Sequence, residues 1–165
     1  MGLMNMLTGT KHPASGVVPR PTQELRAALL ALDPPEGPFT VREGALVGAD
    51  VLAEWRVRES GPGTSVNRVY QIRLRLVPDR REVRALELQR EVTRRGSGGS
   101  GPAVAAKWTR GPVRTVSKEW TVERGPDGRR RLVQTSCWRS SDMRLPLRDA
   151  VLAAGWTWRG VLFKL

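Results

Sequence analysis

Arginines at alternating positions are the residues of this sequence whose type and spacing best suit a recognisable chemistry. In the stretches 51–58, 67–77 and 83–93, arginines alternate with apolar residues, which places them on one side of an extended chain. A guanidinium group offers paired donors to a phosphate or a carboxylate. Three further arginines follow a turn at 126–128. The residues predicted to bind an anion are Arg56, Arg58, Arg73, Arg75, Arg84, Arg90, Arg129, Arg130 and Arg131.

The net charge of the chain supports an anionic partner. It is +12, and 24 of the 28 basic residues are arginine, which favours nucleic acid or an acidic protein surface. Two other interpretations stay open. Codon use in a GC-rich bacterial genome would also enrich arginine. Glutamates on the same strands could pair with the arginines, so that the strands present an ordinary solvated surface of charge pairs. The glutamates concerned are Glu54, Glu82, Glu87, Glu91, Glu119 and Glu123.

The sequence offers little for catalysis. One histidine, His12, and one cysteine, Cys137, exclude an intrachain disulfide and the usual His and Cys metal sites. Cys137 lies in a strand-like stretch and is expected to be half-buried; a thiol activated by His12 is the less favoured alternative. No Gly-x-Ser-x-Gly elbow or phosphate-binding loop is present. We therefore predict no catalytic residue, no metal and no cofactor, and favour a binding protein over an enzyme.

Tryptophan is the second unusual feature, with six in the chain. The segment 155–165, GWTWRGVLFKL, is apolar on both faces, which predicts a central strand of the core. A core role for the tryptophans is favoured. The alternatives are a surface on which bases stack and a cavity for an apolar ligand between sheet and helices. The residues predicted to line such a cavity are Trp55, Trp120, Trp138, Trp156, Trp158 and Tyr70.

The elements that must position these side chains follow from periodicity. Apolar residues at helical spacing predict a helix that starts at a Thr22 cap and stops at the prolines 34–35. A second helix is expected from Pro146 to Ala154. Period-two patterning predicts strands, and turn residues place hairpins at 78–82 and 126–128. The expected strands cover 51–58, 67–77, 83–93, 103–109, 114–123, 129–138 and 155–165.

These elements predict a single α+β domain over 21–165, preceded by an extended or flexible arm over 1–20. Its sheet should be mostly antiparallel and curved, with seven or eight strands and both helices packed against it; closure towards a barrel is an open alternative. No motif is specific enough to indicate a family. Without an apolar run of about 18 residues or a signal peptide, the expected location is the cytoplasm.

The sequence therefore leads to two hypotheses about function. The first is a non-enzymatic binding or accessory protein whose basic sheet face meets an anionic macromolecule, either nucleic acid or an acidic protein. The alternative is a carrier or sensor of a small apolar ligand held in the tryptophan-lined cavity.

Overall fold

The structure of the protein is a computed structural model. This structure describes residues 9–34, 37–61, 63–96, 103–112 and 116–165. Within these residues it contains two α-helices, two short 3-10 turns and eight strands. The predicted α+β class with a mostly antiparallel sheet is confirmed.

Six of the strands form the main sheet, in which five follow the order β1-β2-β3-β4-β5 and each pairs antiparallel with its neighbour. The strand β1 is a short one that the sequence analysis missed. The bounds are β1 Phe39–Glu43, β2 Val51–Gly61, β3 Thr64–Val77, β4 Glu82–Arg95, β5 Ala103–Arg110 and β8 Thr157–Val161.

Strand β4 has two different partners on the same edge. Its first residues, 82–86, pair with β8 in parallel, and its later residues, 88–95, pair with β5 antiparallel. Strand β8 was expected to be central and to run to residue 165. It is instead a five-residue strand with β4 on one side and a single bridge to Lys11 on the other. Phe163 lies beyond it and is 78% exposed, so the apolar residues after 161 do not extend the core strand.

The two helices begin at different residues from those expected. The helix α2, Thr22–Leu30, is preceded by Pro21 and has no side-chain cap, so Thr22 is its first residue and not its cap. The helix α3, Ser140–Ala153, starts six residues before Pro146. Its start is fixed by Asp142, whose carboxylate accepts the backbone N–H of Arg139 at 2.9 Å. Pro146 therefore lies inside the helix, where it costs one backbone hydrogen bond.

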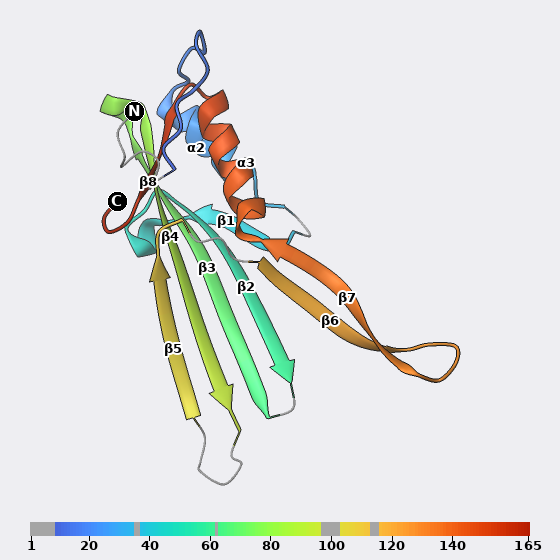
Figure 1. The fold of residues 1–165 in the computed structure, drawn as a ribbon. Helices are drawn as coiled ribbons and strands as arrows, with labels where there is room; N and C mark the ends of the chain where they lie inside the picture. Colours follow the sequence, from blue (N-terminus) through green and yellow to red (C-terminus); the bar gives the residue numbers. More distant parts are fainter. Residues whose placement is uncertain (1–8, 35–36, 62, 97–102, 113–115) are drawn as a thin grey trace.

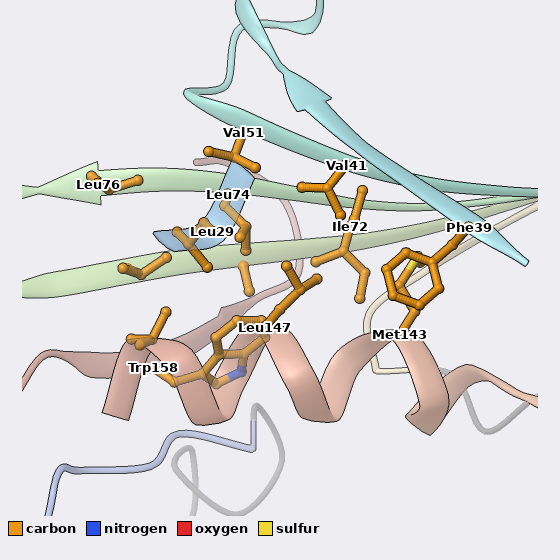
Figure 2. Close-up of a cluster of buried hydrophobic side chains, with 14 of the residues drawn as sticks. Leu29, Phe39, Val41, Val51, Ile72, Leu74, Leu76, Met143, Leu147 and Trp158 are labelled. Carbon is orange, nitrogen blue, oxygen red and sulfur yellow. The ribbon is translucent and has the colours of Figure 1, made fainter. Parts of the chain in front are cut away.

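The hydrophobic core lies between the two helices and one face of the main sheet. In α3, Met143, Leu147 and Val151 recur every four residues and are fully buried. Leu25 and Leu29 do the same in α2. Figure 2 shows Met143 and Leu147 pointing at side chains of the strands. The sheet contributes chiefly Phe39, Val41, Val51, Ala53, Trp55, Val57, Tyr70, Ile72, Leu74, Leu76, Val83 and Ala85.

The core covers only part of the main sheet. We call residues 51–57, 70–77 and 82–89 of β2, β3 and β4 the covered half. We call residues 58–61, 64–69 and 90–95, together with β5, the projecting half. Figure 1 shows the projecting half extending away from both helices. None of its described side chains is buried, whereas β3 becomes buried at every second residue from Tyr70 onward.

The remaining strands, β6 Val116–Arg124 and β7 Arg130–Arg139, form a separate antiparallel hairpin. Figure 1 shows it diverging from the main sheet. The eight described strands are thus divided between a six-stranded and a two-stranded sheet, and they form no closed barrel. The expectation of one continuous sheet of seven or eight strands is corrected accordingly.

Residues 9–21 lie against β8 and the end of α3. Lys11 exchanges two backbone hydrogen bonds with Trp158, at 2.8 and 2.9 Å. The N–H of Arg20 donates to the carbonyl of Ala154 at 2.9 Å, and the carbonyl of Arg20 accepts the indole N–H of Trp156 at 2.9 Å. This segment therefore satisfies polar groups at the end of α3 and along β8. Neither described helix combines the length and apolar character needed to cross a membrane.

Candidate functional site

The two faces of the main sheet differ in charge. The face opposite the helices, which we call the outer face, is defined by strand register and contains every second residue of each strand. Among the described residues its carboxylates are Glu54 and Glu82. Its arginines number ten, and they are Arg42, Arg56, Arg58, Arg73, Arg75, Arg84, Arg90, Arg94, Arg110 and Arg159.

The helix-facing side of the same strands is balanced in charge. Along β2 to β5 it carries three glutamates and three basic residues. Arg68 bridges two of these glutamates, Glu59 at 2.8 Å and Glu91 at 2.7 Å, and the hydrogen bond that it donates to Glu91 raises the pKa of Arg68. The six residues are Glu59, Glu87, Glu91, Arg68, Arg95 and Lys107. The positive excess is therefore confined to the outer face.

A groove crosses the outer face from β2 to β5. Its main hollow has a volume of about 260 Å³ and is lined by Glu54, Arg56, Val69, Gln71, Arg73, Leu88, Arg90 and Trp108. A second hollow of about 190 Å³ shares Val69 and Arg90 with the first and adds Asn67, Val92 and Arg94. We call the two together the outer groove. It has an apolar floor, three cationic side chains around its main hollow and one exposed indole.

Glu54 organises one end of the outer groove. It is 7% exposed and accepts a hydrogen bond from Arg56 Nε at 2.8 Å and one from the amide of Gln71. The Gln71 side-chain oxygen in turn accepts two hydrogen bonds from Arg73, at 3.3 and 3.0 Å. Burial raises the pKa of Glu54, but the hydrogen bonds from Gln71 and Arg56 and the charges of Arg56 and Arg42 outweigh it and lower the pKa overall. The ionised carboxylate therefore holds Arg56 directly and Arg73 through Gln71.

Trp108 and Arg90 form the other end of the outer groove. The two residues are directly opposite each other on β5 and β4, and the Arg90 guanidinium lies over the indole, 5.2 Å from the ring centroid. Trp108 is 62% exposed. Within the described residues, Arg90 has neither an ion pair nor a hydrogen bond to a side chain. Its charge is therefore available to a ligand.

The other arginines predicted to bind an anion are divided between two places. Arg58, Arg75 and Arg84 share the outer face but do not line the groove. Arg75 donates to the carbonyl of Gly48, and Arg84 pairs with Glu82 at 3.0 Å. The remaining three, Arg129, Arg130 and Arg131, are exposed at the turn of the β6–β7 hairpin. There Arg131 pairs with Asp127 at 2.9 Å.

The residues predicted to line a ligand cavity take up positions in the core. Trp55, Tyr70, Trp156 and Trp158 are between 1% and 6% exposed and belong to the same hydrophobic cluster as the helix side chains. The side chains of Trp120, Trp138 and Cys137 lie outside the described part of the structure. Trp108 lies on the outer face of β5 and is exposed.

A buried polar cluster that the sequence analysis missed lies between α3 and the sheet. Arg144 donates to both carboxylate oxygens of Glu87, at 2.5 and 2.6 Å, and the Tyr70 hydroxyl donates to the same carboxylate. Burial raises the pKa of Tyr70 well above its ordinary value, and the neighbouring Glu87 charge raises it further. Although burial lowers the pKa of Arg144, the hydrogen bond and charge of Glu87 raise it overall. The cluster ties α3 to β3 and β4, and its trace in the sequence is Glu87, which follows Val83 and Ala85 on the helix-facing side of β4.

No described group of three or more His, Cys, Asp or Glu side chains is arranged to hold a metal ion. The ring of His12 lies 3.3 Å from the hydroxyl of Thr157, beside β8. The fold and the groove together define an α+β domain with a basic, open sheet face. Comparison of the chain with protein-family models, curated proteins and solved structures gave no match.

Proposed function

We propose that the protein is a non-enzymatic binding or accessory protein whose outer groove binds an anionic macromolecule. The observation that carries the proposal is the segregation of charge between the two faces of one sheet. Among the described residues, ten arginines and two carboxylates on the outer face leave eight positive charges uncompensated, whereas the opposite face of the same strands carries four glutamates and three basic residues. A surface of arginine–glutamate pairs would show similar numbers of both signs on each face.

The geometry of the groove adds to this argument. Arg56 and Arg73 are held in place by hydrogen bonds before any ligand arrives, which reduces the entropy lost on binding. Because the groove is open along β3 and β4 and extends as far as Arg94, it suits a long ligand better than a compact one. A polyanion would engage several guanidinium groups at once, and its affinity would fall steeply with salt.

The test is a titration followed by fluorescence anisotropy at two salt concentrations. The labelled probes are a single-stranded DNA, the same sequence as RNA and as duplex DNA, and a polyglutamate peptide. The variant R56Q/R73Q/R90Q removes three charges from the groove, and R129Q/R130Q/R131Q removes three from the hairpin turn as a control of equal net charge. We expect the groove variant to bind at least one probe roughly tenfold or more weakly than the hairpin variant does, since each lost phosphate contact weakens binding.

Two results would contradict the proposal. One is the absence of binding to every probe at low salt. The other is an equal loss of affinity in the two triple variants, which would show that total charge matters and the groove does not.

A further inference from the structure

We infer that the macromolecule in the outer groove is a single-stranded nucleic acid that stacks a base on Trp108 and places phosphates against Arg56, Arg73 and Arg90. This inference rests on the proposed function and narrows its ligand to one chemical class. The evidence is the combination of an exposed indole, an apolar floor and guanidinium groups in one groove.

Trp108 is the first part of that evidence. It is 62% exposed although it is the largest side chain on its strand, and the Arg90 guanidinium lies over its ring. A tryptophan left in water on a regular strand contributes little to folding, since the area that could drive folding stays hydrated. An indole face is a good stacking surface for any base, and such stacking tolerates sequence.

Arg90 supplies the second part. It lies 5.2 Å from the Trp108 centroid without a carboxylate partner among the described residues. Its guanidinium lies over one face of the indole, so a base would stack on the other face with this cation next to it. Arg56 and Arg73 line the same hollow on the far side of Val69, so a chain that crosses the groove meets cations at both ends.

The floor of the groove distinguishes a single strand from other polyanions. Val69, Leu88 and Val92 present apolar surface between the arginines. Duplex DNA hides the flat faces of its bases within the stack, and it is read by elements that enter a groove, which an open sheet face does not do. An acidic peptide brings carboxylates but no run of flat aromatic rings. Only a single strand offers both phosphates and unstacked bases in regular alternation.

The experiment compares three variants of the full chain with the wild type. W108A removes the stacking surface, W108F keeps an aromatic ring, and F163A removes an aromatic of 78% exposure outside the groove as the matched control. The probes are a labelled single strand of about 12 nucleotides, within the usual site size, in DNA and RNA form, its duplex, and inorganic polyphosphate, which carries the charge without bases. Circular dichroism verifies that each variant is folded.

We expect the wild type to bind the single strand more tightly than the duplex or polyphosphate. W108A should weaken single-strand binding roughly 5- to 100-fold, the range given by the loss of one base stack, and leave polyphosphate binding unchanged. W108F should restore most of the affinity, and F163A should have no effect. R56Q/R73Q/R90Q should lower the slope of log K against log salt by about 2, from three lost contacts at about 0.7 each.

The contrary outcomes separate this inference from the proposed function. If W108A weakens polyphosphate as much as the single strand, or if the duplex or polyglutamate binds best, the single-strand inference is wrong while an anion-binding groove stands. If no polyanion binds the wild type at low salt, both are wrong.

Discussion

The covered and projecting halves of the main sheet belong to the same three long strands but are built on different principles. In the covered half, β3 carries Tyr70, Ile72 and Leu74 on its helix side, all at most 1% exposed. In the projecting half the same face of β3 carries Arg68, which pairs with glutamates on both neighbouring strands. One half is stabilised by apolar burial, and the other by strand pairing and charge pairs.

This difference shows how a protein of this size can present a wide surface. The helices and the core fix β2, β3 and β4 at one end. The same strands then continue as a platform that needs no core of its own, because backbone pairing along their full length holds it. The outer groove lies where the two halves meet, with Gln71, Arg73 and Leu88 from the covered half and Arg90 and Trp108 from the projecting half. The groove is therefore bordered on one side by the packed covered half and on the other side by the solvent-exposed projecting half.

The largest effect should come from truncating the core of the covered half. Leu74→Ala should lower the free energy of unfolding by about 2–5 kcal/mol, because the site is fully buried. The matched truncation in the projecting half, Val69→Ala, removes a half-exposed side chain and should cost less than about 1 kcal/mol. Urea unfolding of both variants measures the contrast. Similar losses at the two positions would mean that the projecting half carries as much packing as the covered one.

The buried ion pair between α3 and the sheet should give the next largest effect. Glu87→Gln leaves Arg144 without its charged partner, and we expect the free energy of unfolding to fall by about 2–3 kcal/mol. This value is towards the low end for a buried pair because the Arg144 side chain is 19% exposed. Asp127→Asn breaks the exposed pair with Arg131 and should change stability by less than about 1 kcal/mol. Equal effects in urea unfolding would show that the Glu87 pair is solvated.

Alkaline pH tests the Tyr70 hydroxyl, the only tyrosine hydroxyl in the chain. Its pKa is raised in the folded protein, first by burial and then by Glu87, above the ordinary value of 10.0. Its contribution to stability should therefore be complete below pH 10 and be lost as pH rises above 10, where only the unfolded chain ionises. Tyr70→Phe should cost about 1.5 kcal/mol near neutral pH and progressively less above pH 10. A difference from wild type that stays constant to pH 11 would contradict the raised pKa.

The smallest effect should come from Glu54 in the outer groove. Its folded pKa lies below the ordinary value of 4.5 despite burial, because of Gln71 and the nearby arginines. The stability that it contributes is present above pH 4.5 and is lost as pH falls below that value. Glu54→Gln should therefore destabilise the protein by roughly 1 kcal/mol at pH 7 and approach the wild type at acid pH. Thermal unfolding at pH 7 and at pH 3.5 measures the two differences.

The covered half was the part of the fold that sequence patterning predicted best. Alternation of Val51, Ala53 and Trp55, and of Tyr70, Ile72 and Leu74, predicted one buried face, and the structure buries these residues as expected, although Leu52 and Glu54 on the opposite face of β2 are buried as well. The same alternation placed the six strand arginines on one side. Register then brought Arg56, Arg73 and Arg90 to one hollow, which periodicity alone could not do because it does not specify how neighbouring strands align.

What the sequence did not reveal depends on tertiary context. Trp108 has the size and apolar character of a core residue, but it lies on the face of β5 opposite the helices and is exposed in the described part of the structure. Glu87 was interpreted as a surface glutamate because its partner, Arg144, is 57 residues away on a helix whose start was misplaced. The parallel pairing of β8 with β4 was also missed, since it requires the crossover through α3. Each error arose from a partner distant in sequence.

The edges of the projecting half have a consequence for solubility. In the described structure β1 pairs with β2 only up to Trp55, and β5 borders the sheet on the other side, so two long strands offer backbone groups to any passing strand. Charged side chains such as Arg56, Arg58, Lys107 and Arg110 stand along these edges, and two copies that approached edge to edge would repel each other. These edge charges, Arg56 of the groove among them, thus also keep molecules apart, and neutralising them with a bound polyanion or by substitution would favour self-association.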